Sequence, residues 1–148
     1  MTFKFIKFDK SVSLKKYLNK KLSKNTNVFR YNFHKNNSDK EQLMMIWQRK
    51  NYFFPPKKFL DTSKTYFLLK GKLDVFIFNS KGKIIQTCYL SQLNPVCRIK
   101  RNVYHCDVAK SKIAIHCEIT NHSFLGRKMK FLDNKYFLKI KNFILKKY

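Results

Sequence analysis

The sequence contains little glycine and few acidic residues. Its glycines stand only at positions 71, 82 and 126, so it has no glycine-rich loop of the kind that cradles a nucleotide phosphate. Eight acidic residues against 33 basic ones leave few carboxylates for paired acid–base chemistry, and Asp74 and Glu118 are the ones in strand-like segments. The Gly-x-Ser-x-Gly nucleophile motif is also absent. These absences argue against P-loop chemistry and serine-hydrolase chemistry.

Long apolar runs and closely paired cysteines are missing as well. No stretch approaches the roughly 18 uncharged apolar residues that span a bilayer. The first residues, MTFKFIKFDKSVSLKK, carry scattered charges and lack the apolar segment of a signal peptide. Cys88, Cys97, Cys106 and Cys117 form no CxxC pair and lie in apolar, strand-like surroundings. We therefore expect reduced thiols and a cytoplasmic protein.

The formal net charge of +25 would ordinarily indicate a nucleic acid or an anionic surface as the partner. However, lysine outnumbers arginine 28 to 5, asparagine occurs 13 times and alanine only twice. A/T-rich coding produces this skew, because lysine and asparagine have A/T-rich codons. Arginine, which makes the bidentate contacts of nucleic-acid readers, is scarce. A solvated lysine-rich face is the favoured interpretation, and binding to nucleic acid or an anionic membrane surface stays an alternative.

The hydrophobic pattern is helical at both ends of the chain and strand-like between them. Residues 11–24 have one apolar stripe at helical spacing. From Val28 the period is two, and roughly eight short apolar segments follow with turn signals between them. Residues 65–71, 72–79 and 83–90 read as a β-meander joined by hairpin turns. The pattern predicts a mainly β sandwich or barrel over 28–124, after an N-terminal strand or helix extension over 1–27.

The last segment, 125–148, predicts a basic amphipathic helix. Phe137, Ile140 and Ile144 form one face of it, and lysines occupy much of the remainder. Such a helix either packs on the sandwich or binds an anionic membrane or a partner.

Residues 51–71 have the spacing of a metal-binding motif without its ligands. In the cupins, a superfamily of small β-barrels, the first motif places two histidines and a glutamate on facing strands. With the closing glycine laid on position 71, the histidines fall on Lys57 and Phe59, and the glutamate falls on Lys64. The histidine of the second cupin motif falls on His105. The chain thus resembles a cupin with a degenerate metal site.

Only Gly71 and His105 match the two motifs outright. Gly71 matches the closing glycine of the first motif, and the opening glycine falls on Asn51. Asn102 falls on a turn glycine of the second motif and is a fair substitute, because asparagine tolerates positive φ.

A longer resemblance covers the chain from about Val28 to Phe124, which looks like the WbuC-type cupin-fold proteins found among O-antigen and surface-polysaccharide genes. In RYNFHKNNSDKEQLMMIWQRKNYFFPP, the residues that fit the family's opening are Arg30, Asn32, His34 and Gln42. TYFLLKGKLDVFIFNSKGKIIQTCYL is similar to its next block, VYHCDV stands at its Trp-His segment, and Glu118 falls on a late-strand glutamate. The resemblance implies a mainly β, cupin-type jelly-roll fold and a role in polysaccharide metabolism. A cupin dimer would be allowed by an exposed β edge.

The residues at the ligand positions do not favour a metal or another cofactor. A divalent ion needs neutral imidazoles and a carboxylate, whereas Lys57 and Lys64 would bring two positive charges to the same point. Phe59 supplies no lone pair, and His105 alone cannot offset that repulsion. His105-Cys106 and His116-Cys117 do not build a zinc site either, because adjacent side chains on a strand point to opposite faces. We expect no metal.

The same residues would instead line a cationic pocket for a phosphate, a carboxylate or an acidic sugar. The positions expected at this pocket are Lys57, Lys64, His105, His34, Asn32 and Tyr66, with Glu118 as a partner of His105 or of a pocket lysine. In the alternative, the pocket has collapsed: its lysines reach solvent past aromatic neighbours, Phe59 fills the space, and His105 is a core histidine.

Three functions remain open on the sequence, and whether the chain is an enzyme is not decided by it. The leading hypothesis is a metal-free protein that binds a small anionic carbohydrate or a nucleotide sugar in surface-polysaccharide metabolism. The second is an active sugar isomerase or epimerase with His105 as its acid or base. The third is a polyanion or membrane-surface binder that uses the lysine-rich termini.

Overall fold

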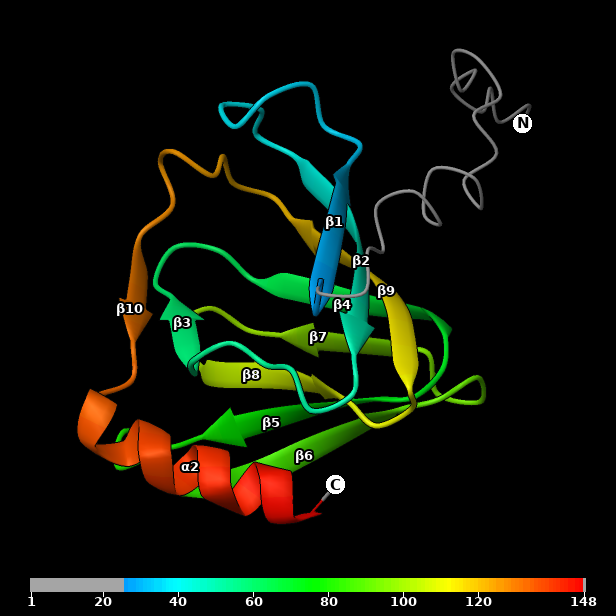
Figure 1. The fold of residues 1–148 in the computed structure, drawn as a ribbon. Coiled ribbons are helices and arrows are strands. Elements are labelled where there is room, and N and C mark those ends of the chain that lie inside the picture. The colour runs from blue at the N-terminus through cyan, green and yellow to red at the C-terminus, as the bar shows by residue number, and fades with distance from the viewer. Residues whose placement is uncertain (1–25, 148) are drawn as a thin grey trace.

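The computed structural model describes residues 26–147, and in this range the chain folds into ten strands and one helix (Figure 1). The strands are β1 (Val28–Asn32), β2 (Gln42–Arg49), β3 (Lys57–Phe59), β4 (Lys64–Lys70), β5 (Leu73–Phe78), β6 (Ile84–Leu90), β7 (Val96–Ile99), β8 (Tyr104–Ala109), β9 (Ile113–Thr120) and β10 (Met129–Phe131). The helix is α2 (Asn134–Lys147). The helix predicted for residues 11–24 lies outside the described residues.

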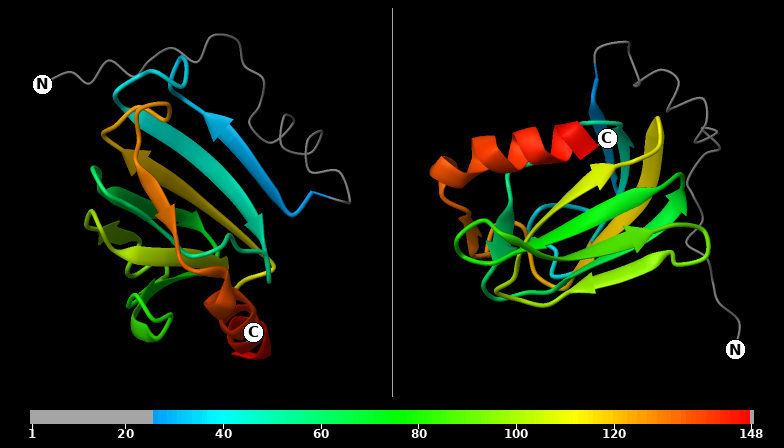
Figure 2. Two further views of the ribbon diagram at one scale, coloured as in Figure 1. Left: turned by 90° about the vertical axis from the view of Figure 1, so that its left-hand side faces the viewer. Right: turned by 90° about the horizontal axis from the view of Figure 1, so that it is seen from below.

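Two five-stranded antiparallel sheets build a sandwich. Sheet A has the order β1-β2-β9-β4-β7, and sheet B has the order β10-β3-β8-β5-β6. The helix α2 lies against the outer face of sheet B, where Ile140 and Ile144 are buried among side chains of β5 and β8 (Figures 1 and 2). This arrangement confirms the predicted mainly β jelly-roll fold, as a sandwich of two separate sheets and not a closed barrel.

The strand β8 is buried along its whole length, because its two faces meet different layers of the molecule. Tyr104, Cys106 and Val108 pack toward α2 in one apolar cluster. His105 and Asp107 alternate with them and face the space between the sheets. Polar side chains thus reach the interior from a strand whose other face is apolar.

The pairing of the predicted meander is partly wrong. Strands β5 and β6 form the expected hairpin, but β4 and β5 belong to different sheets. Between them Gly71 has a φ of 87°, and a Cβ at this position would clash with the main-chain oxygen of Ile113. The chain therefore crosses here from sheet A to sheet B. A turn signal in the sequence indicates a change of direction but does not distinguish a hairpin from a crossing between sheets.

The C-terminal segment forms a helix within the predicted range, with the strand β10 before it. Ile140 and Ile144 are buried and Phe137 is half-buried, so the helix packs on the sandwich as the first of the two interpretations proposed. No helix among residues 26–147 is long and apolar enough to cross a membrane.

Candidate functional site

A cavity of about 420 Å³ opens between the two sheets at the end where β3 and β10 lie. All seven residues that the sequence assigned to a site line it: Asn32, His34, Lys57, Lys64, Tyr66, His105 and Glu118. They come from β1, the loop after β1, β3, β4, β8 and β9. The pocket has therefore not collapsed, although Phe59 is buried in its wall.

The backbone keeps the turns of the cupin motifs at this site. Asn51 and Asn102, which stand at motif glycine positions, have φ values of 67° and 64°, and Gly71 has 87°. Asparagine is one of the few residues with a side chain that accept this left-handed region. Lys57 on β3 is the direct cross-strand partner of His105 on β8. The frame that would bring metal ligands together is thus present with other side chains on it.

Lys64 and Glu118 form an ion pair inside the cavity. Lys64 Nζ lies 2.6 Å from Glu118 Oε2, and the two side chains are only 4% and 9% exposed. Burial on its own raises the pKa of Glu118, but the Lys64 ammonium and the nearby His116 hold it well below its usual range. Of the two partners predicted for Glu118, the structure selects the pocket lysine. Consequently Lys64 is a fixed, neutralised charge and does not reach solvent.

Lys57 has a different environment. Its Nζ lies 5.4 Å from the ring centre of Phe54 and 5.9 Å from that of Phe59, and it forms none of the ion pairs found among residues 26–147. Burial, followed by repulsion from the Lys64 ammonium, lowers the pKa of Lys57 to about 8. Lys57 is therefore a much weaker base than an ordinary surface lysine.

His105 is a neutral imidazole with a defined orientation. Its Nδ1 is 2.9 Å from the main-chain oxygen of Val103, and a carbonyl only accepts, so Nδ1 carries the proton. Its Nε2 is buried and has no hydrogen-bond partner among residues 26–147. Burial, with help from the Lys64 ammonium, lowers the pKa of His105 to about 4. His105 thus offers an unused lone pair at the cavity.

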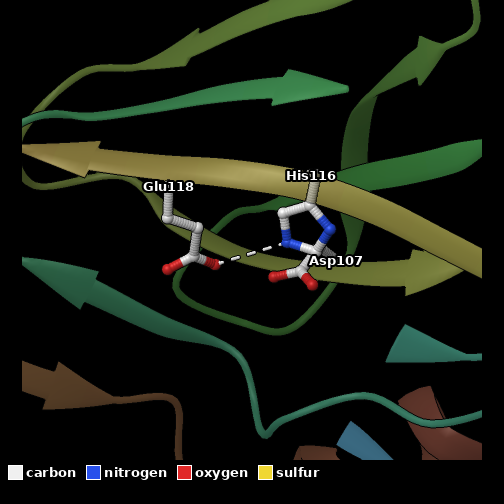
Figure 3. Close-up of side chains that lie close together, drawn as sticks. All are labelled: Asp107, His116 and Glu118. Atoms are coloured by element: carbon white, nitrogen blue, oxygen red, sulfur yellow. Dashed lines mark ion pairs between the residues drawn. The ribbon is translucent and has the colours of Figure 1, made fainter. Parts of the chain in front are cut away.

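Asp107, His116 and Glu118 form a buried polar group whose side chains lie close together (Figure 3). The possible metal-ligand atoms of Asp107, His116 and Glu118 all lie within 4.8 Å of one another, and the three residues are buried. Tyr66 donates its hydroxyl proton to Asp107 Oδ1 at 3.0 Å, and burial together with Asp107 raises the pKa of Tyr66 well above its usual value. His116 Nε2 lies 3.9 Å from Glu118 Oε1.

The cupin fold implies a metal, and the residues at its motif positions do not fit one. Lys57, Phe59 and Lys64 occupy three of the four ligand positions. Phe59 has no lone pair to offer, and the two lysines have none while their amines are protonated. The two carboxylates of this buried group already have partners, since Glu118 binds the Lys64 ammonium and Asp107 accepts a hydrogen bond from Tyr66. A divalent ion bound by Asp107, His116 and Glu118 would have Glu118 as a ligand, and the Lys64 ammonium lies 2.6 Å from that carboxylate. The two positive charges would therefore repel each other at short range.

Three charged lining residues were missing from the sequence-based site, Arg30, Asp107 and Arg127, and so was His116, which is buried beside Asp107 and Glu118. The Arg30 guanidinium lies 4.6 Å from the ring centre of Phe54, and that of Arg127 lies 4.4 Å from the ring centre of Phe59. Arg30 had a usable signal, because it is one of the residues that fit the opening of the WbuC-type family. Asp107 follows His105 by two positions and so shares its face of the strand, a spacing that would have predicted it.

Comparison with known proteins identifies the fold. A family model described as a domain of unknown function (DUF6016) matches residues 18–90. No curated protein matches the sequence. Among solved structures, the capsular polysaccharide assembling protein CapF from Staphylococcus aureus has a TM-score of 0.60 at 16% identity, over 70% of this chain and 31% of that one.

Two enzymes are also similar in structure. L-Ribose isomerase from Cellulomonas parahominis, solved with L-psicose, has a TM-score of 0.60 at 10% identity, over 72% of this chain and 70% of that one. Oxalate decarboxylase from Bacillus subtilis has a TM-score of 0.55 at 13% identity, over 71% of this chain and 27% of that one. The chain spans between 23% and 31% of the first three structures it matches. At these identities the likeness shows the fold alone: residues 26–147 adopt a cupin fold.

Proposed function

We propose that the chain is a WbuC-like cupin-fold protein that binds a small anionic carbohydrate or a nucleotide sugar in surface-polysaccharide metabolism. The ligand occupies the cavity between the sheets and needs no metal. The four cysteines are free, as a protein of the cytoplasm would have them.

The observation that carries this proposal is the charge around the cavity. Four basic side chains, Arg30, Lys57, Lys64 and Arg127, and two acidic ones, Asp107 and Glu118, line it. Since Lys64 is neutralised by Glu118, the cations left to meet a ligand are those of the two arginines and Lys57. Arginine is the side chain best suited to bidentate recognition of a carboxylate or phosphate.

Neutral groups in the same cavity suit a sugar. Asn32, His34 and the Nε2 of His105 offer hydrogen-bonding atoms, and Phe54 and Phe59 offer apolar ring surface. The volume of about 420 Å³ lies in the range of small-molecule pockets. Similar structures include a capsular polysaccharide assembling protein and a sugar isomerase, which supports a carbohydrate as the ligand.

Calorimetric titration with a hexose phosphate, glucuronic acid, UDP-glucose and glucose tests the proposal. We expect the charged ligands to bind and neutral glucose to bind far more weakly. Arg127→Gln should weaken binding by about tenfold to a hundredfold, the value of a charge-assisted hydrogen bond. Arg98→Gln is the matched control, because Arg98 contacts Ser63 Oγ at 3.2 Å and does not line this cavity. Equal binding of glucose, or equal losses in the two variants, would contradict the proposal.

A second candidate is sugar isomerisation or epimerisation with His105 as the acid or base, and the unpartnered, neutral Nε2 favours it. Such an enzyme moves a proton at the carbon beside a carbonyl. Deuterium incorporation from D₂O into L-ribose or a hexose phosphate would detect that step by NMR. We expect the rate to fall as the pH drops through about 4, where His105 gains a proton, and to vanish in His105→Asn. Exchange that persists in His105→Asn would exclude this role.

A further inference from the structure

Lys57 and Lys64 line the same cavity, but only one of them is held by a counter-ion. Glu118 holds the Lys64 ammonium at 2.6 Å, whereas Lys57 Nζ lies 5.4 Å from the ring centre of Phe54 and 5.9 Å from that of Phe59. A second ammonium in the same cavity and aromatic walls together disfavour the protonated form of Lys57. These are the two conditions that turn a lysine into a nucleophile: desolvation and a cationic neighbour.

The pKa of about 8 agrees with this geometry. Besides Lys64, the charged groups that act on Lys57 are Glu118 from β9, Asp107 from β8 and Arg127 before β10. The two carboxylates favour the protonated amine, yet Glu118 is already paired with Lys64 and Asp107 accepts from Tyr66. Repulsion and desolvation therefore outweigh their attraction.

We propose that Lys57 forms an imine with the open-chain carbonyl of an aldose or ketose held in this cavity. This inference rests on the proposed function, because the anionic end of the sugar is what Arg30 and Arg127 would hold. The carbonyl end then lies toward β3 and β8, where Lys57 and His105 are direct cross-strand partners. Directly opposite residues in an antiparallel pair have Cβ atoms about 5 Å apart, so both side chains can reach one carbonyl.

The step balances without an oxidant or reductant. The Lys57 nitrogen lone pair attacks the carbonyl carbon, a C–N bond forms, and the π electrons move to oxygen, which takes up a proton. The nitrogen gives up one proton, and the carbinolamine then loses water as the C=N bond forms. His105 Nε2, which carries no proton and has no partner in the described part of the chain, can relay a proton from nitrogen to oxygen. The product is a covalent sugar–lysine imine.

Glycolaldehyde phosphate is a suitable probe, since it has an aldehyde and a phosphate and cannot close a sugar ring. The full-length protein is incubated with it at neutral pH, reduced with sodium cyanoborohydride, and mapped by peptide mass spectrometry. Lys57 should be modified roughly tenfold faster than the other lysines, because a larger share of its amine is unprotonated. Uncharged glycolaldehyde should show a smaller preference for Lys57, since the arginines do not hold it.

Two conservative variants at neighbouring positions control the experiment. Lys57→Arg keeps the positive charge but cannot form an imine, so fast labelling should disappear while glycolaldehyde phosphate still binds. Lys58→Arg should leave labelling unchanged, because Lys58 faces the opposite side of β3, with its Nζ 4.8 Å from the ring centre of Tyr104. NMR shifts measured without reductant report binding independently of covalent chemistry.

The outcomes separate the two proposals. Binding of glycolaldehyde phosphate with Lys57 modified no faster than Lys58 would overturn the imine and leave the proposed function standing. Fast labelling of Lys57 by both probes, without phosphate-dependent binding, would support the nucleophile and count against an anionic ligand. Neither binding nor fast labelling would overturn both.

Discussion

At the scale of single residues, the centre of this cupin fold is organised around ammonium groups. One of them, Lys64, is paired with Glu118, and the other, Lys57, is held among aromatic rings. The pair is buried, so the two charges depend on each other. Each member therefore has a role in stability that is separate from any role in binding.

Removing one member of the pair should destabilise the protein strongly. Glu118→Gln leaves a buried ammonium and Lys64→Met leaves a buried carboxylate, and each should cost about 3 to 5 kcal/mol. The double variant should recover much of that loss, because no charge is left unpaired. Urea unfolding of the four proteins gives the coupling energy as a double-mutant cycle. Additive losses in the double variant would mean that the pair contributes nothing as a pair.

His105 predicts a dependence of stability on pH. Its pKa is about 4 in the folded protein against 6.5 for an ordinary histidine, so between these values the unfolded chain binds the extra proton. Stability should accordingly fall as the pH drops from about 6.5 to 4, by on the order of 3 kcal/mol from this residue. His105→Asn keeps a donor for Val103 and does not ionise, so its stability should fall less over this range. Parallel unfolding curves at each pH would contradict the prediction.

At the scale of secondary-structure elements, β8 divides the interior into two compartments. One face carries His105 and Asp107 toward the cavity, and the other carries Cys106 and Val108 toward α2. The helix is consequently a part of the folded core. Deleting residues 128–148 would expose this core, so a loss of binding after such a deletion would not show that the helix binds a partner.

Two aliphatic side chains of equal size on α2, one buried and one exposed, provide a matched test of this packing. Ile144 is fully buried, so Ile144→Ala should lower the free energy of unfolding by about 2 to 4 kcal/mol. Leu138 is 68% exposed on the same helix, and Leu138→Ala should change stability by no more than about 0.5 kcal/mol. Denaturant unfolding compares them directly. Equal effects would mean that α2 does not dock on sheet B.

Sequence alternation predicted the longer strands and the cavity residues for one physical reason. A strand that separates an apolar layer from a polar cavity must alternate, and β4, β8 and β9 do. The strands β3 and β10 have three residues each, too few for a period to be visible. The proximity of Asp107 on β8 to His116 and Glu118 on β9 was missed, because it depends on how the two sheets face each other. That relation is absent from the pattern of either strand.

At the scale of the whole molecule, the charge of +25 is far larger than the cavity accounts for. The remaining lysines lie mostly at exposed positions of residues 26–147, as the favoured interpretation of a solvated face expects. Polyanion binding through this surface is still an alternative function. It would differ from ligand binding in the cavity by its response to salt.

Salt dependence should separate the two kinds of binding. Single-stranded DNA or anionic vesicles that contact many lysines should lose affinity steeply as KCl rises, because counterions are released on binding. A hexose phosphate in the cavity should lose far less, since only a few charges contact it. Replacing the exposed Lys139, Lys141 and Lys146 by glutamine should weaken polyanion binding and leave the sugar unaffected. A hexose phosphate whose affinity falls in step with that of DNA would indicate binding at the surface.

The ion pair of Lys64 with Glu118 has a consequence for how the protein depends on its surroundings. A metal ion must be acquired, can be lost to a chelator, and can be exchanged for a competing ion. The positive charge of Lys64 is instead synthesised with the chain, one per molecule, and is held in place 2.6 Å from its carboxylate. This charge does not vary with the supply of an element in the growth medium, so under the proposed metal-free function the cavity would keep it in a cell starved of transition metals.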